Sequence, residues 1–166
     1  MTDDGNVSSV RVLVVDDFEP FRSLVRSLLK KTPRFLVVRE VSDGLEAVRK
    51  VTELDPDLVL LDINLPGLSG IEVARRIRRL SPRTKIVFLT QDFSDDLVAE
   101  AFNLGAHGYV VKARTSTDLL PAVETVMQGC QFVIHGLAGS NESSGGPAPC
   151  NSAYSVVNHQ KRHGPG

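Results

Sequence analysis

The stretch LVLLDINLPGLSG, residues 58–70, joins a short aliphatic run to an acid, a Pro-Gly pair and the start of a helical pattern. Short runs without polar interruption are typical of strands that are buried on both faces of a sheet. Ser69 and Glu72 have capping-box spacing, which predicts that a helix begins there. The stretch therefore predicts a strand, a loop and a helix, with Asp62 at the end of the strand.

The same alternation of an apolar run and a helical pattern occurs five times. The expected strands are residues 10–15, 35–39, 58–61, 85–89 and 109–111. Strands that alternate with helices predict βαβ units and a parallel sheet. Asp43 and Ser94 are the expected caps of the second and fourth helices. We expect the fifth helix to begin within residues 116–118, because a cap at Asp118 would leave Pro121 in the tolerant first turn.

Composition and charge exclude several classes of protein. The 166 residues include 19 basic and 20 acidic side chains, a net charge of −1, which argues against a general nucleic-acid binder. No apolar run approaches the ~20 residues of a membrane span. The first residues, MTDDGNVSS, lack the cationic and apolar regions of a secretory signal, so we expect a cytoplasmic protein.

Three segments differ in composition. Residues 1–9 are expected to be a flexible N-terminus, and residues 10–129 to be the folded domain. Residues 130–166 are expected to be a disordered tail, because Gly, Ser, Pro and Asn dominate most of this segment. Such a composition buries too little apolar surface to offset the entropy lost on ordering.

Polar residues end four of the expected strands. They are Asp16 and Asp17, Asp62, Thr90, and Lys112. Ligands of open parallel sheets bind at the carboxyl ends of the strands, so we expect these side chains to converge. Clustered carboxylates repel one another unless a cation neutralises them, and oxygen ligands of this kind suit Mg²⁺. A lysine and a hydroxyl beside them can hold a transferred phosphoryl group, which predicts a phosphoryl-transfer site with a carboxylate nucleophile.

On these residues the chain resembles the receiver domain of bacterial two-component response regulators. The resemblance covers about residues 10–128 and rests on the motifs VLVVDD, LVLLDINLPGLSG, KIVFLT and GAHGYVVKA. It implies a flavodoxin-like, doubly wound α/β fold with a five-stranded parallel sheet in the order 2-1-3-4-5 and helices on both faces. The chain resembles receivers of DNA-binding regulators, but no second set of amphipathic helices follows. We therefore expect no direct contact with nucleic acid. The absence of an apolar run of membrane length predicts no contact with a membrane either.

The resemblance also implies the metal-site roles. Asp62 would accept a phosphoryl group from a histidine kinase, a phosphotransfer protein or a small phosphodonor. Asp17 and Asp62 would bind Mg²⁺ directly, together with the main-chain carbonyl of Asn64, and Asp16 would bind it through water. The chain would then be a regulatory phosphoprotein and not an enzyme, although it is expected to assist its own phosphorylation from small donors and its own dephosphorylation.

The remaining roles concern the response to phosphorylation. Thr90 and Lys112 would hold the phosphoryl oxygens, and Tyr109 would be the switch aromatic that turns inward once Thr90 moves. An aspartyl phosphate adds negative charge that attracts the hydroxyl and the lysine, so a local movement can bias a two-state surface. That surface would be the fourth helix, the fifth strand and the fifth helix, which would bind a downstream protein or a second copy of the chain.

Two departures from the family pattern, and the polar pair that flanks the acceptor, carry further predictions. Gln91 follows Thr90 where a small residue is usual, which predicts restricted access for large donors. Ala113 follows Lys112 where proline is common, which leaves open whether that peptide bond is cis. Asn64 and Asp92 flank the acceptor and are predicted to position a water molecule that shortens the life of the phosphoryl group.

Three alternatives remain open on the sequence alone. A receiver fold that is never phosphorylated would be a docking module, for which Gln91 is the only support. An aspartate-nucleophile phosphatase of the haloacid dehalogenase type would need a second acid where Asn64 stands. A flavodoxin-like nucleotide or flavin binder would need a phosphate-binding loop where the chain reads DDFEP.

Overall fold

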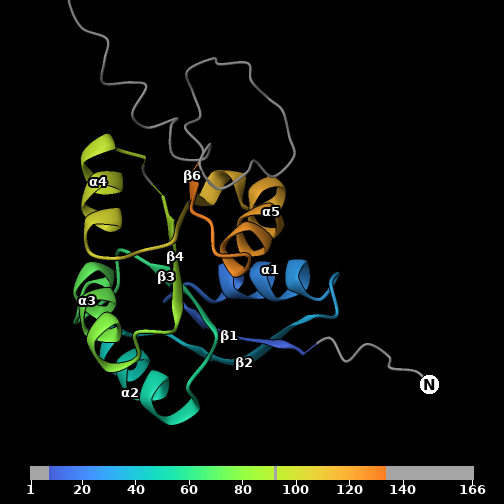
Figure 1. Cartoon of the computed structure of the whole chain (residues 1–166), viewed down its shortest axis with the longest axis horizontal. Helices are drawn as coiled ribbons and strands as arrows, with labels where there is room; N and C mark the ends of the chain where they lie inside the picture. Colours follow the sequence, from blue (N-terminus) through green and yellow to red (C-terminus); the bar gives the residue numbers. More distant parts are fainter. Residues whose placement is uncertain (1–7, 92, 134–166) are drawn as a thin grey trace, which may run out of the picture.

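The computed structural model describes residues 8–91 and 93–133, which form one parallel sheet with helices on both faces (Figure 1). The strands are β1 (Val10–Val15), β2 (Phe35–Val41), β3 (Leu58–Asp62), β4 (Lys85–Thr90), β5 (Gly108–Val111) and β6 (Phe132–Val133). The helices are α1 (Glu19–Leu29), α2 (Gly44–Leu54), α3 (Gly70–Leu80), α4 (Asp95–Asn103), the 3₁₀ turn η1 (Lys112–Arg114) and α5 (Thr115–Met127). The predicted α/β class and alternation are confirmed.

The sheet has one strand more than the sequence predicts. Its order is β2-β1-β3-β4-β5-β6, which contains the expected 2-1-3-4-5 and adds β6 beside β5. In β6, Phe132 and Val133 pair in parallel with Gly108 and Tyr109. The five-strand count is therefore corrected to six. A strand of two residues has no periodicity of its own, so only its pairing with β5 identifies it.

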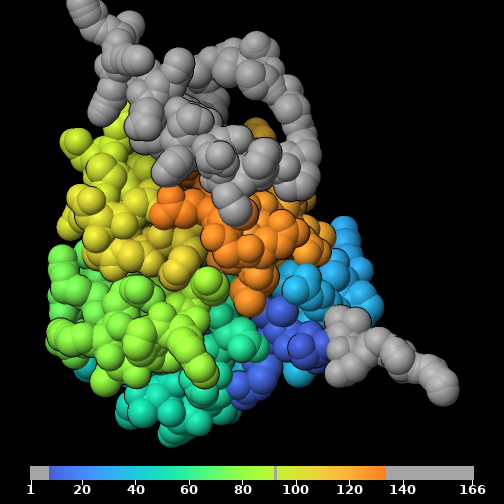
Figure 2. Space-filling view, viewed as in Figure 1, coloured from blue at the N-terminus to red at the C-terminus, as the bar shows by residue number. Residues whose placement is uncertain are grey.

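Two apolar cores fill the space between the sheet and its helices. One core joins the sheet to α2, α3 and α4, and the other joins it to α1 and α5. Successive strand residues point to opposite faces, so alternate residues of the central strands contribute to each core. In the space-filling view α2, α3 and α4 follow one another along one side, with α1 and α5 on the other (Figure 2). Strands buried on both faces explain the uninterrupted aliphatic runs.

Side-chain caps begin three of the helices where the sequence predicts them. Asp43, Ser69 and Ser94 accept hydrogen bonds from the main-chain N–H groups three residues later. The fifth helix differs from the prediction: α5 begins at Thr115, and Pro121 lies inside it. Asp118 is no cap, because its carboxylate pairs with Arg114 at 2.8 and 3.2 Å. The η1 turn leads directly into α5, so the helix starts earlier than a proline in the first turn would allow.

The predicted flexible N-terminus lies outside the described residues apart from residues 8 and 9. The tail predicted over residues 130–166 is described only up to residue 133, and there the prediction of disorder is wrong, because Phe132 and Val133 pair with β5. Asp92 lies outside the described residues as well. Within the described ranges, none of the helices combines the length and the apolar character that crossing a membrane would require.

Candidate functional site

The carboxyl edge of the sheet brings together three of the predicted side chains from three different strands. Asp16 follows β1, Asp62 ends β3 and Lys112 follows β5. Each lies two residues beyond a strand residue that packs in the α1–α5 core, namely Val14, Leu60 and Val110. Strand side chains alternate between faces, so the three polar groups share the α1–α5 side of the sheet. The convergence therefore follows from strand register.

The ammonium of Lys112 lies between the two buried carboxylates. Its Nζ is 2.6 Å from Oδ2 of Asp16 and 3.4 Å from Oδ2 of Asp62. The side chain of Asp16 is fully buried and that of Asp62 is 4% exposed, so both charges are largely removed from water. Paired charges in such a place attract strongly, because little solvent screens them. Lys112 thus contacts Asp62, as predicted, and contacts Asp16 more closely.

The environment of Asp62 disfavours its charge. Burial, and then the negative charge of Asp16, raise the pKa of Asp62 above its ordinary value, while Lys112 acts in the opposite direction. The main-chain N–H of Asn64 donates a hydrogen bond of 3.1 Å to Oδ1 of Asp62. A carboxylate under such opposing influences gains from any further cation beside it.

The same cluster has the geometry of a cation site. Carboxylate oxygens of Asp16, Asp17 and Asp62 lie within 4.8 Å of one another. Oδ2 of Asp16 is buried and makes no hydrogen bond, although the Lys112 ammonium is close to it. Asp17 is exposed at the rim, so the cluster opens to solvent on one side. An all-oxygen set with one open side fits a small hard cation such as Mg²⁺, which keeps several waters.

Thr90 and Tyr109 lie on the face of the sheet opposite the α1–α5 side. Both side chains are 1% exposed. Phe88 pairs with Tyr109 and Thr90 pairs with Val111, which places Thr90 and Tyr109 diagonally on the α4 side. The ring of Phe93 meets that of Tyr109 edge-to-face, with centroids 6.0 Å apart. Tyr109 therefore already occupies the inward position that the sequence analysis assigns to the switched state.

A pocket beside Asp62 gives access to the cluster from the α1 side. It is about 870 Å³ and is lined by Asp17, Phe18, Pro20, Phe21, Leu24, Asp62, Asn64, Gln91, Lys112 and Ala113. Gln91 is one of the lining residues and is exposed to solvent. The Lys112–Ala113 peptide is trans, which answers the question that Ala113 left open. Asp92, the other predicted flanking residue, cannot be placed because it lies outside the described residues.

Several residues of the site are absent from the sequence prediction. The Nζ of Lys112 lies 4.5 Å from the centre of the Phe21 ring, a cation–π contact. Phe18 and Leu24, which are 60% and 37% exposed, also line the pocket. Gly70 packs against the carbonyl of Asp62, where a Cβ would lie 2.1 Å from that oxygen. Of these contacts, only the close approach at Gly70 has a signal in the sequence, because a glycine at the first position of a helix is a sign of close packing.

A family model and two curated relatives all relate this chain to response regulators. Residues 12–124 match the family described as "Response regulator receiver domain". The chain is 32% identical over 133 residues to the transcriptional regulatory protein DegU of Brevibacillus brevis, covering 80% of this chain and 56% of that protein. It is 34% identical over 125 residues to the nitrate/nitrite response regulator protein NarL of Escherichia coli K12, covering 75% and 58%. The chain thus spans somewhat more than half the length of these curated relatives.

Solved structures show the same likeness in three dimensions. The chain superimposes on a LuxR-family two-component response regulator of Aurantimonas sp. SI85-9A1 with a TM-score of 0.73 and 34% identity, covering 78% of this chain and 91% of that one. It also superimposes on the signal receiver domain of the putative response regulator NarL of Mycobacterium tuberculosis with a TM-score of 0.70 and 32% identity, covering 74% and 98%.

Proposed function

The chain belongs to the response regulator receiver family, and we propose that it is a switch that accepts a phosphoryl group on Asp62 with Mg²⁺ held by Asp16, Asp17 and Asp62. The observation that carries this proposal is the cluster itself. A buried carboxylate that lines a pocket lies within reach of a lysine and two further acids. Nothing in ordinary packing favours three acids in so small a volume, because their mutual repulsion destabilises the fold.

In the proposed reaction a carboxylate oxygen of Asp62 attacks the phosphorus of the donor. A bond forms between that oxygen and phosphorus, and the bond from phosphorus to the donor's nitrogen or oxygen breaks, with its electron pair leaving on the donor. Mg²⁺, when bound, supplies positive charge beside the incoming phosphoryl oxygens. Lys112 needs only a small movement of its ammonium from Asp16 toward the new phosphoryl oxygens. The main-chain carbonyl of Asn64 is proposed as a further metal ligand, and Asp16 as one that acts through water.

The response is proposed to begin at Thr90. Its hydroxyl would turn toward the phosphoryl group, which changes the space beside Tyr109 on the same face of the sheet. Phe93 packs on the Tyr109 ring and precedes α4, so a shift of the ring is transmitted to that helix. The surface formed by α4, β5 and α5 would then bind a downstream protein or a second copy of the chain.

Two features are proposed to tune the site. Gln91, which lines the pocket, would favour small donors over bulky ones. Asn64 and Asp92 would position the water that hydrolyses the acyl phosphate. Replacing either by alanine should slow the loss of phosphate measured over time, and unchanged rates in both variants would contradict this second role.

The partners follow from the reaction. Receivers of this family take phosphoryl groups from histidine kinases or other phosphodonors, so a histidine kinase or a phosphotransfer protein is the proposed donor. DegU is a transcriptional regulatory protein and NarL a response regulator, and this chain spans only part of the length of each. The absence of direct contact with nucleic acid therefore stays a prediction, as does a cytoplasmic location.

The decisive experiment is phosphorylation of the purified full chain by acetyl phosphate with Mg²⁺. Mass spectrometry should show one phosphate-sized gain in the wild type and none in Asp62→Asn. Asp96→Asn, which removes an exposed carboxylate from the first turn of α4, is the matched control and should behave as the wild type. No gain in the wild type would favour the docking module, and continued hydrolysis of an unrelated phosphate ester would favour the phosphatase.

A further inference from the structure

We infer that Arg22 is a positioning residue of the metal site, which fixes the main chain at Asp16 and is itself held in place by Glu40. Arg22 belongs to α1 and Glu40 to β2, and neither carries any part of the proposed reaction. The inference rests on the proposed function, because it concerns the ability of Asp16 and Asp17 to hold a cation.

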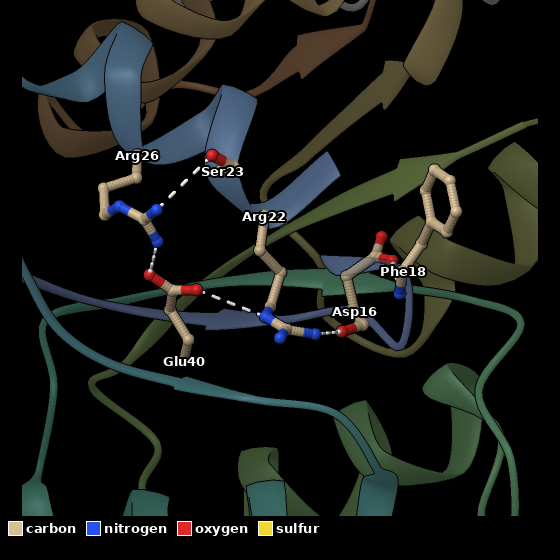
Figure 3. Close-up of polar contacts among 6 residues, drawn as sticks. All are labelled: Asp16, Phe18, Arg22, Ser23, Arg26 and Glu40. Atoms are coloured by element: carbon tan, nitrogen blue, oxygen red, sulfur yellow. Dashed lines mark hydrogen bonds and ion pairs between the residues drawn. The ribbon is translucent and has the colours of Figure 1, made fainter. Parts of the chain in front are cut away.

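The contacts form a continuous chain of hydrogen bonds (Figure 3). Nη1 of Arg22 donates to the main-chain carbonyl of Asp16 at 2.7 Å, and Nε of the same guanidinium donates to Oε1 of Glu40 at 3.2 Å. Arg26 donates to the other oxygen of Glu40 and contacts Ser23 at 3.3 Å. Glu40 therefore joins two arginines of α1 to the strand next to β1.

The arginine acts at the point where the chain leaves the sheet. The N–H of Asp16 still donates to the carbonyl of Val41 in β2, at 3.1 Å, and Oδ1 of Asp16 accepts from the N–H of Phe18 at 2.8 Å. The carbonyl of Asp16 faces Arg22, so main chain and side chain are held from three directions. With the peptide fixed, Oδ2 of Asp16 is kept buried beside Lys112.

The Arg22–Glu40 pair is suited to hold the main chain at Asp16 in one position. The side chains of Arg22 and Glu40 are 16% and 21% exposed, so water competes little for their hydrogen bonds. A guanidinium has donors in a rigid fork and can serve two acceptors at once, which an ammonium on a flexible stem does poorly. Removing a residue that hydrogen-bonds to a metal ligand and orients it commonly lowers the metal affinity 10–100-fold.

Charge alone gives a different explanation, and the chain offers a way to separate the two. A positive group near three acids would lower their repulsion whatever its shape. However, Glu40 contacts Arg22 directly and offsets its charge. If geometry is what matters, a lysine at position 22 should fail to replace the arginine; if charge is what matters, it should succeed.

The test measures Mn²⁺ binding to the full chain by electron paramagnetic resonance, with unfolding by urea as a second measurement on each variant. We expect Arg22→Gln and Arg22→Lys to weaken Mn²⁺ binding to a similar extent, roughly tenfold. Glu40→Gln should weaken it less, because the amide still accepts a hydrogen bond. The double variant should bind no more weakly than Arg22→Gln alone, since the two residues act as one unit.

A matched control comes from the other end of the sheet. Arg34 pairs with Glu124 at 3.1 Å and belongs to no part of the site. Arg34→Gln removes an arginine–glutamate pair with an effect on folding only, so its Mn²⁺ affinity should equal that of the wild type.

The outcomes separate the inference from the function. If the wild type takes up phosphate and binds Mn²⁺, but Arg22→Gln binds Mn²⁺ equally well, the inference alone is overturned. Full binding by Arg22→Lys, or equal loss in Arg34→Gln, overturns it too, in favour of charge or of general stability. A wild type that neither binds Mn²⁺ nor gains phosphate refutes the proposed function itself.

Discussion

The polar groups at the two edges of the sheet differ in whether the protein itself supplies their partners. At the amino edge the groups satisfy one another: Arg11 donates to the carbonyls of Leu54 and Asp55, and Nδ1 of His107 accepts from the N–H of Ile86. At the carboxyl edge three acids face a single lysine, and Oδ2 of Asp16 has no hydrogen bond.

Loops between strands and helices build both edges, from strand to helix at the carboxyl edge and from helix to strand at the amino edge, so the presence of loops does not explain the difference. Polar groups whose hydrogen bonds are satisfied within the protein stabilise a fold. Buried charges without enough partners are stabilised by binding an external cation or ligand. The contrast teaches that the amino edge contributes to stability and the carboxyl edge to binding. Four measurements can break or sharpen it.

The largest effect is expected from the lysine of the carboxyl edge. Lys112→Gln should lower the rate of phosphorylation by acetyl phosphate roughly a hundredfold, because it removes a preplaced positive group from the site where negative charge develops. Lys85→Gln, a lysine at the start of β4 on the amino edge, should leave that rate unchanged. Equal rates in the two variants would remove the distinction between the edges.

Gly70→Ala should destabilise the fold by about 3 kcal/mol, because its Cβ would overlap the carbonyl of Asp62 and the Cα of Ile63. Gly67 lies in the same loop with φ +77° and has nothing within 4 Å of a Cβ. Gly67→Ala should therefore cost only about 1 kcal/mol, from backbone strain. Urea unfolding of both variants measures the difference, and a smaller loss in Gly70→Ala than in Gly67→Ala would contradict the close approach at Asp62.

The amino edge should respond to pH through His107. Burial, with lesser contributions from Lys85 and Arg78, lowers the pKa of His107 from 6.5 to about 4. Between these values the unfolded chain binds the proton and the folded chain does not, so stability is present above pH 6.5 and falls as the pH falls toward 4. The loss should be about 3 kcal/mol over this window. In His107→Gln this part of the pH dependence should be missing from urea unfolding curves; identical curves would refute the assignment.

The smallest effect concerns the exposed acid of the cluster. Without metal, Asp17→Asn should stabilise the fold by about 0.5 kcal/mol, because it removes one of three mutually repelling charges. With Mg²⁺ the order should reverse, since bound metal stabilises only the chain that holds it. Thermal unfolding with and without Mg²⁺ tests both statements. A melting temperature of Asp17→Asn that rises with Mg²⁺ as much as that of the wild type would remove Asp17 from the metal site.

Much of the fold and of the site follows from local sequence. Aliphatic runs and capping residues predict the first five strands and the starts of three helices, because burial and capping act over a few neighbouring residues. Asp16, Asp62 and Lys112 could be brought together in advance, since parallel strands end at the same edge and residues two apart share a face.

Only the tertiary structure decided the rest, because it depends on which remote groups meet. The β6 strand exists through its pairing with β5, and the start of α5 depends on the turn that leads into it. Whether Phe21 covers Lys112, and whether Arg22 reaches both the Asp16 carbonyl and Glu40, depends on the rotation and depth of α1 against the sheet. Hydrophobic periodicity identifies the buried side of a helix, but the partners of its flanking polar residues come from strands elsewhere in the chain.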